Sequence, residues 1–329
     1  MELRQLRYFL RVADFKSFSR AALAVRIAQP ALSRHIRKLE EELGVALFYR
    51  DGRGAILTEQ GQRYYERVTD ILRQLDQAAA ELQTDYDMPT GEVVLGVPTE
   101  LGPRFILQIV QSFRARYPNA RIRIAESGSA QIAEWLQSSR LDAGFIYDPQ
   151  DYQTLPIKTV VEEMLYLIGP KGDHITAPES VPFRDVVHLP LILPELGGNL
   201  RQRIIGAAAR LGQTANCETD IDSLPAIKQA VTEGAGYTVL PYAAVCEEIR
   251  RGLLSAARIV EPDLVRPLGF AIRPNGALSV VTTKLVALVQ HEIGSLLDTG
   301  KIMGNAKDHA APKSGRKSSP IPAYAAEAV

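Results

Sequence analysis

Apolar residues recur at helical spacing over the first 43 residues and predict three helices. In the last of them, residues 30–43, one apolar stripe at i, i+4, i+7 and i+11 is formed by Leu32, Ile36, Leu39 and Leu43. A first helix has its own stripe at Leu3, Leu6, Leu10 and Ala13. Ser17 or Ser19 can cap a short second helix over residues 19–25. Because the last two helices are joined by a short turn, the pattern predicts a helix-turn-helix.

The polar face of the third helix carries donors and no acid in its first two turns. Opposite the apolar stripe lie Pro30, Ser33, Arg34 and Arg37, and Gln29 precedes them. Hydroxyl, amide and guanidinium donors suit phosphate oxygens and the O6/N7 edge of guanine in a major groove. Taken alone, the pattern also fits an ordinary amphipathic helix with a solvated face.

A strand, a tight turn and a second strand are predicted over residues 45–58. The turn DGRG can adopt positive φ, and Arg50 and Arg53 lie beside it. These arginines are candidates for contacts to a nucleic-acid backbone or minor groove. The alternative is a solvated hairpin tip.

Residues 59–87 form one long helical pattern whose apolar positions alternate in steps of three and four. The seam consists of Tyr65, Val68, Leu72, Leu75, Ala79, Leu82 and Tyr86. About 28 helical residues would reach roughly 42 Å, which is more than a small domain needs. The seam therefore predicts a partner helix, most simply that of a second copy. The alternative is packing along the carboxy-terminal part of the same chain.

From residue 89 onward, short apolar runs alternate with helical patterns. The runs span residues 93–97, 122–126, 143–147, 164–169, 191–194, 237–241 and 268–272. Strands that alternate with helices predict a parallel α/β sheet, in one piece or two. The last residues, 301–329, are rich in Ala, Pro, Ser and Lys and poor in bulky apolar residues, which predicts a disordered tail.

Charge is divided unevenly although the net charge of the 329 residues is zero. Residues 1–58 contain 11 Lys and Arg against 6 Asp and Glu, a net charge of +5, where the helix-turn-helix is predicted. Such a surplus is the electrostatic footprint expected on DNA. The amino terminus lacks an uninterrupted apolar h-region, no stretch approaches a membrane span, and the two cysteines, Cys217 and Cys246, lack metal-ligand spacing. These features predict a cytoplasmic protein.

No catalytic, metal or cofactor site is predicted. The five histidines are scattered, and motifs of the HExxH, GxSxG and P-loop types are missing from the sequence. The GxG in EGAGYTVLP lies before a predicted strand, whereas a dinucleotide loop needs its glycines after one.

The first 60 or so residues resemble the winged helix-turn-helix of LysR-type transcriptional regulators. The matching stretches are LRQLRYFLRVADFKSFSRAA, AQPALSRHIRKLEEELGVALFYR and LTEQG. The resemblance implies DNA contacts by Gln29, Pro30, Ser33, Arg34 and Arg37, and a wing that carries Arg50 and Arg53. It also implies a dimer through the long helix, assembled in some members into a tetramer, and RNA polymerase as a further candidate partner.

The same resemblance implies a multidomain α+β chain with an effector-binding region similar to periplasmic binding proteins. We expect a DNA-binding domain at 1–58, a linker helix at 59–88, and an effector domain at 89–300. Its lobe I would span about 89–160 and 268–300, and its lobe II about 161–267, with crossover strands near 160–168 and 265–272. The competing hypothesis is a cytoplasmic small-molecule-binding protein without a regulatory DNA role.

An effector site is predicted where strands lead into helices. Open parallel sheets bind ligands at these ends, and exposed helix N–H groups favour an anion there. The candidate residues are Pro98, Thr99, Glu100, Ser127, Ser129, Phe145, Gly197, Gly198 and Asn199. A small organic anion is thus one expectation, but the carboxylate of Glu100 would repel it, so a neutral or amine-bearing effector stays open.

Overall fold

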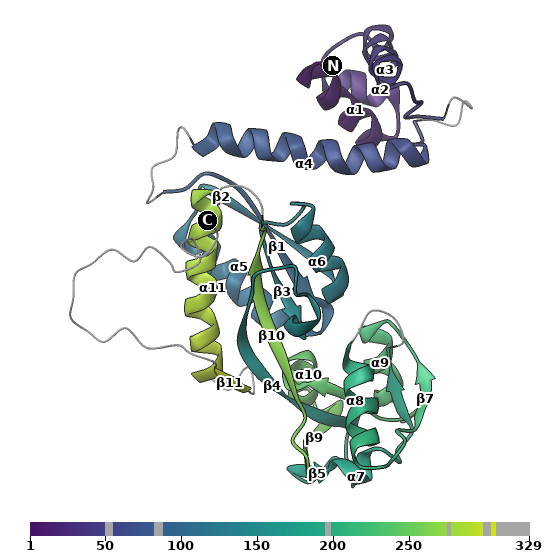
Figure 1. The fold of residues 1–329 in the computed structure, drawn as a ribbon, viewed down its shortest axis with the longest axis vertical. Coiled ribbons are helices and arrows are strands. Elements are labelled where there is room, and N and C mark those ends of the chain that lie inside the picture. The colour runs from purple at the N-terminus through teal and green to yellow at the C-terminus, as the bar shows by residue number, and fades with distance from the viewer. Residues whose placement is uncertain (50–54, 82–87, 195–198, 275–277, 299–303, 307–329) are drawn as a thin grey trace, which may run out of the picture.

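The computed structural model describes residues 1–49, 55–81, 88–194, 199–274, 278–298 and 304–306. A small helical domain lies at one end, a long helix runs beside it, and two α/β lobes follow (Figure 1).

The small domain is built from α1 (Leu3–Phe15), α2 (Phe18–Ala24) and α3 (Gln29–Leu43). Leu32, Ile36 and Leu39 are buried in its core as predicted. The stripe predicted for α1 is partly wrong: Leu3 is 51% exposed, while Phe9 and Val12 are fully buried. Ser17 caps α2, since its hydroxyl accepts the amide of Arg20 at 3.4 Å. The helix-turn-helix prediction is confirmed.

The predicted hairpin after α3 is present as a single antiparallel bridge between Phe48 and Leu57. Its turn, residues 50–54 with Arg50 and Arg53, lies outside the described residues. The stem is held from α3, because the buried Glu40 carboxylate accepts the amides of Leu47 at 2.8 Å and Phe48 at 3.2 Å. Glu40 is therefore a structural residue that fixes the stem on the helix.

Helix α4 (Glu59–Glu81) packs its first half on its own small domain. Val68 and Leu72 are buried in that core, and the Tyr65 hydroxyl donates to Asp14 on α1 at 2.6 Å. The prediction that the whole seam faces a partner is thus corrected, because its first half is an intrachain contact. Leu75 is 41% exposed, Ala79 is exposed, and Leu82 lies outside the described residues.

Lobe I has a sheet in the order β2-β1-β3-β10-β4, in which β10 spans Val265–Ile272 and β4 spans Ile157–Pro170. Parallel pairs join β1 (Gly91–Pro98) to β2 (Ala120–Ser127) and β3 (Ala143–Tyr147). The core on one face of the sheet includes residues of α5 (Pro103–Arg116) and α11 (Val280–Asp298). The residues of α6 (Ser129–Gln137) belong to a second core with Val94 and Ile146.

Lobe II continues the sheet through the far half of β4 and adds a second, smaller sheet. Its strands are β5 (Ser180–Pro182), β6 (Leu191–Leu193), β7 (Cys217–Asp220), β8 (Thr238–Pro241) and β9 (Leu254–Val260). Its helices are α7 (Phe183–Val186), α8 (Asn199–Arg210), α9 (Leu224–Thr232) and α10 (Tyr242–Arg250). All seven predicted strands are present, whereas β5, β7 and β9 were not predicted. The predicted parallel sheet is corrected to a mixed one, because β4 pairs antiparallel with β8 and β9 and β10 returns antiparallel to β3.

Two strands cross between the lobes, β4 (Ile157–Pro170) and β10 (Val265–Ile272), so the predicted crossovers are confirmed. Two short 3-10 helices, η1 (Thr99–Leu101) and η2 (Pro149–Asp151), follow β1 and β3. The predicted disorder from residue 301 is contradicted at one point, because β11 (Gly304–Ala306) pairs with β4. Residues 307–329 lie outside the described part.

Candidate DNA-binding face and inter-lobe cavity

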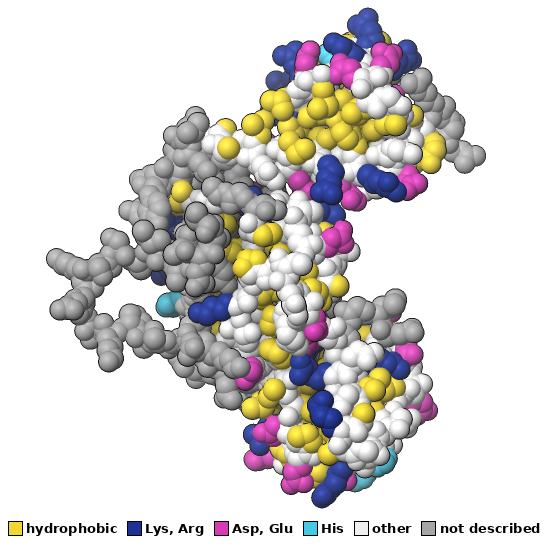
Figure 2. All heavy atoms as spheres, in the orientation of Figure 1, with side chains coloured by type: hydrophobic (Ala, Val, Ile, Leu, Met, Phe, Trp, Pro, Cys, Tyr) yellow, Lys and Arg dark blue, Asp and Glu magenta, His cyan; other side chains and the backbone are white. Residues whose placement is uncertain are grey.

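Helix α3 presents the donors that the sequence predicted. Gln29, Pro30, Arg34 and Arg37 are exposed, and Ser33 is half-buried. Gln29 Nε2 donates to Ser33 Oγ at 3.1 Å, which orients both side chains. Figure 2 shows Lys and Arg side chains, with Asp and Glu side chains among them, at the end of the small domain where α3 lies.

The backbone and core keep this face rigid. Pro30 occupies the first turn, and the extended residue Ala28 precedes the helix, as the sequence predicted. At the other end Gly44 adopts a left-handed conformation with φ of 70°, which stops the helix without strain. The side chains on α3 are therefore presented by a helix fixed at both ends.

A second surface of the small domain is apolar. Figure 2 shows apolar side chains gathered above α4 in this view. Ile71 on α4 is 54% exposed, and Leu3, Leu75, Ala78 and Ala79 are also exposed. Such a patch on a soluble domain is typical of an interface.

A cavity of about 430 Å³ lies between the lobes, and we call it the inter-lobe cavity. Its described lining residues are Thr99, Glu100, Gly128, Ala130, Gln131 and Glu134 from lobe I, and Pro194, Leu200, Asp222, Leu224, Ile227 and Leu240 from lobe II. It lies at the carboxyl ends of β1 and β2, where the sequence placed the effector. Its size is that of a site for a small organic molecule.

The predicted effector residues have different positions around this cavity. Thr99 and Glu100 line it. Pro98, Ser127 and Ser129 lie at the same strand ends but are not among its described lining residues, and the Ser129 hydroxyl accepts the Tyr147 amide at 3.0 Å. Gly197 and Gly198 lie outside the described residues.

Two of the predicted contacts differ from expectation. Phe145 is fully buried against Phe105 and Phe270 in the lobe I core, so the prediction that it contacts the effector is wrong. Alternate residues of β3 face opposite sides of the sheet, and Phe145 lies on the side of this core. Asn199 donates instead to Asp151, a contact from α8 of lobe II to η2 of lobe I.

A buried ion network beside the cavity was missed by sequence reasoning. Arg266 on β10 is 2% exposed; its Nε lies 3.0 Å from Asp148 Oδ2, and its Nη1 lies 3.3 Å from Glu100 Oε1. Arg203 of lobe II also pairs with Asp148, which is 1% exposed. In the sequence, Asp148 directly follows a predicted strand and Arg266 lies just before another, and this was the only indication of the ion pair. The two residues come together only in the folded structure.

A second pair extends the network into the crossover strand β4. Arg266 lies 4.1 Å from the centre of the Tyr147 ring, and the Tyr147 hydroxyl donates to Glu163 Oε2 at 2.5 Å. Burial raises the pKa of Glu163 to about 7, and burial together with Glu163 raises the pKa of Tyr147 well above its ordinary value. The crossover region thus holds a carboxyl group that titrates near neutrality.

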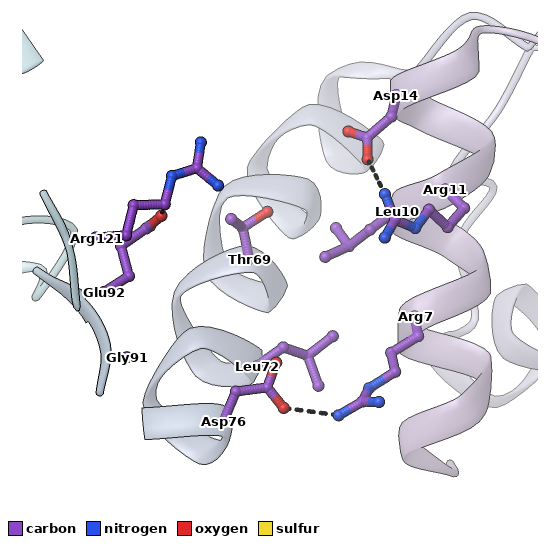
Figure 3. Close-up of a pocket in the computed structure, with 10 residues that line it drawn as sticks. All are labelled: Arg7, Leu10, Arg11, Asp14, Thr69, Leu72, Asp76, Gly91, Glu92 and Arg121. Carbon is purple, nitrogen blue, oxygen red and sulfur yellow. Dashed lines mark hydrogen bonds and ion pairs between the residues drawn. The ribbon is translucent and has the colours of Figure 1, made fainter. Parts of the chain in front are cut away.

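A larger cavity, about 630 Å³, lies between the small domain and lobe I (Figure 3). Its walls come from α1, α4, β1 and β2, and they carry both signs of charge. The charges on these walls are paired: Arg7 on α1 with Asp76 on α4 at 2.7 Å, Arg11 with Asp14 within α1 at 3.9 Å, and Arg121 on β2 with Glu92 on β1 at 3.3 Å. The Arg7–Asp76 pair links the two helices, and the three pairs together leave no single charge sign for a ligand to match.

Two family models match the chain. Residues 3–62 match the bacterial regulatory helix-turn-helix protein, lysR family, and residues 87–294 match the LysR substrate binding domain. The chain is 30% identical to the HTH-type transcriptional regulator BbuR of Bordetella bronchiseptica, over 79% of this chain and 80% of that protein. It is also 30% identical to the uncharacterized regulator YwbI of Bacillus subtilis, over 92% of this chain and 99% of YwbI.

Solved structures share the fold. The structure of full-length CbnR in complex with its target DNA matches with a TM-score of 0.69 at 24% identity. The match covers 89% of this chain and 100% of that chain. No helix in the described part of the chain combines the length and apolar composition that a membrane span requires.

Proposed function

The chain belongs to the LysR family of DNA-binding, effector-responsive transcriptional regulators, and we propose that it reads operator DNA through α3 while a small molecule binds in the inter-lobe cavity. The single observation that carries the DNA assignment is the exposed face of α3, with no acid over its first two turns. The cavity between the lobes at the strand ends supports the effector assignment.

On DNA, we assign Gln29, Pro30, Ser33 and Arg34 to the major groove. Arg34 is exposed on the same face as the Gln29–Ser33 pair, so its guanidinium can reach a base edge while the pair supplies a second polar contact. Arg37 lies one turn further on and suits a phosphate. We assign Arg50 and Arg53 to the backbone or minor groove on the sequence alone.

We further propose that the active form is a dimer through the second half of α4. Leu75 and Ala79 expose the continuation of a seam whose first half is already buried on the same chain. A second copy of the helix would cover this patch. Two copies of the basic face would then contact one duplex, which strengthens retention at physiological salt.

The protein acts, in this proposal, in the cytoplasm and without catalysis. The family models that match the chain describe transcriptional regulators, which supports a role without catalysis. RNA polymerase is the partner that such a regulator would contact at a promoter.

The test is selection of duplexes from a random pool by the full-length protein, followed by mobility shift at fixed salt. We expect a dyad-symmetric site to be enriched, with two half-sites on one face of the DNA. A pool that stays random after repeated rounds would instead favour a small-molecule-binding protein without a regulatory DNA role.

A further inference from the structure

The two walls of the inter-lobe cavity differ in chemistry. The lobe I wall presents polar side chains from η1 and α6, including Glu100, Gln131 and Glu134. The lobe II wall is mostly apolar and includes Leu200, Leu224, Ile227 and Leu240. A ligand that contacts both walls needs a polar end toward lobe I and an apolar body toward lobe II.

The polar side of the cavity is acidic. The described lining residues of the cavity include Glu100 and Glu134 on lobe I and Asp222 on lobe II, and no Lys, Arg or His. Glu134 and Asp222 are exposed to solvent at this cavity, and such carboxylates attract a cation and repel an anion.

The nearby arginines do not reverse this charge. Arg266 lies behind the wall, almost fully buried, and is shared between Glu100 and Asp148. Arg203 also pairs with Asp148, so these two cations face two carboxylates. Glu134 accepts a hydrogen bond from the neutral amide of Gln131 at 2.7 Å, and no ion pair joins it to another described residue. Its negative charge remains available to a ligand.

The cavity is too large for a metal ion, and its acids do not form a metal-binding group. Among the described residues no three carboxylate, thiol or imidazole groups are placed to hold an ion. A volume of about 430 Å³ instead suits a small organic molecule.

From these features we propose that the effector is a small amine-bearing molecule with an apolar body, whose protonated amine lies against Glu134. This inference rests on the proposed effector site in the inter-lobe cavity. The Glu100 carboxylate is already held by Arg266 and by the Thr99 hydroxyl, which donates to Glu100 Oε2 at 3.0 Å. The amino terminus of α6, which also borders the cavity at Gly128, can accept a carboxylate. The required group is therefore the amine, and an amino acid or a simple amine can supply it.

The experiment uses two matched sets of compounds with the full-length protein. One set is 3-methylbutylamine, leucine and 4-methylpentanoate; the other is pentylamine, norleucine and hexanoate. Within each set the apolar body is similar and the charged groups differ. Isothermal titration calorimetry at neutral pH and fixed ionic strength measures binding, and thermal unfolding provides a second readout.

We expect binding by at least one amine-bearing member of a set and at least tenfold weaker binding by its matched carboxylate. A carboxylate that binds as tightly as its matched amine overturns the proposal. Absence of binding by every amine at millimolar concentration also overturns it.

Two variants locate the amine. Glu134→Gln removes one negative charge from the wall and should weaken amine binding about tenfold, the loss expected for one charge-assisted contact. Glu233→Gln is the matched control. Glu233 is exposed and accepts a hydrogen bond from Gln229 at 2.6 Å, just as Glu134 accepts one from Gln131. Unlike Glu134, Glu233 is not among the described residues that line the cavity. It should bind amines as wild type does.

Mobility shift with a selected duplex separates the two levels of the proposal. If wild type selects no duplex, the proposed function fails whatever the amine result. If wild type binds its duplex but Glu134→Gln and wild type bind amines equally, the amine inference alone fails.

Discussion

The exposed face of α3 and the inter-lobe cavity are both assigned to binding, but they carry opposite charge and are assembled differently. The α3 face is basic, and all its side chains come from one helix of 15 residues. The cavity is acidic, and its lining comes from segments between Thr99 and Leu240. The ligand proposed for α3 is a polyanion, whereas the ligand proposed for the cavity carries an amine.

This difference shows how one chain with zero net charge can serve two ligands. The basic surplus is concentrated on the outside of the small domain, where it acts through solvent on DNA. The acidic groups of the cavity instead depend on buried arginines that hold some of them in place. Breaking each arrangement should therefore have different consequences.

The largest effect is expected at Arg266. Arg266→Met removes the cation from two carboxylates, and Asp148 is only 1% exposed, so it would stay buried with one fewer partner. Breaking a buried pair costs about 3 to 5 kcal/mol. Urea unfolding followed by the fluorescence of Trp135, the single tryptophan, reports on lobe I directly.

Arg203→Met is the matched control for that experiment. Its side chain is 25% exposed, and Asp148 would retain Arg266, so the free energy of unfolding should fall by less than in Arg266→Met. Equal stability of Arg266→Met and wild type would show that the network contributes nothing to the lobe.

The next effect separates the two halves of α4. Leu75→Glu places a charge on the exposed half, where a dimer would have to bury it in both copies at a cost of about 3 kcal/mol or more. We expect sedimentation to give a monomer with a folded small domain. Operator affinity should fall accordingly.

Leu72→Glu should behave differently, because Leu72 is buried in the core of its own small domain. It should unfold that domain, as circular dichroism would show. A Leu75→Glu variant that sediments as wild type would remove the second half of α4 from the interface.

Local patterns explain how far the sequence could predict this molecule. The stripe on α3 and the strand runs depend on residues near each other in the chain, and the structure agrees with them. The two crossovers were instead expected from the family resemblance, and the structure agrees with these too. Strand β7 was not predicted, because its sequence CETD is mostly exposed and carries no apolar run. The sequence predicted that the whole seam on α4 faces a partner helix, whereas its first half packs on its own small domain. Periodicity identifies an apolar face but not which core covers it.

The candidate sites follow the same rule. Arg34 could be assigned from spacing on one helix, and its exposure agrees. The Arg266–Asp148 pair joins residues 118 apart in sequence, so no local pattern reports it. Phe145 was wrongly predicted to contact the effector, because its position after a glycine in a short strand did not reveal which face of the sheet it would occupy.

A smaller effect concerns pH and the Tyr147–Glu163 pair. Since the pKa of Glu163 is raised from 4.5 to about 7, the folded protein keeps this proton while the unfolded chain loses it. Its contribution to stability is therefore complete below pH 4.5 and is lost as pH rises toward 7. Glu163→Gln has no carboxyl group to titrate at this position, so it does not lose this stability. The free energy of unfolding of the variant minus that of wild type should therefore rise by about 2 to 3 kcal/mol between pH 5 and 8.

Unfolding of both proteins in urea at several pH values measures this difference, since other titrating groups are common to both. Tyr147, Arg266 and Glu100 also face Glu163, so Tyr147→Phe serves as a second variant. Removing the hydroxyl that donates to the carboxylate should raise the pKa of Glu163 further. A stability difference between wild type and Glu163→Gln that is independent of pH would refute the assignment.

The smallest effect tests the α3 face itself. Arg34→Ala should cost about 1 to 3 kcal/mol on the selected duplex and much less on random DNA, because a bidentate contact to guanine is lost. Arg34→Lys keeps the charge but not the planar fork of donors, so it should retain the salt dependence of binding while losing base preference. Mobility shift at several salt concentrations, with selected and random duplexes, distinguishes the variants. If Arg34→Ala weakens both duplexes equally, Arg34 contacts phosphate, and the base selectivity of α3 must come from Gln29 and Ser33.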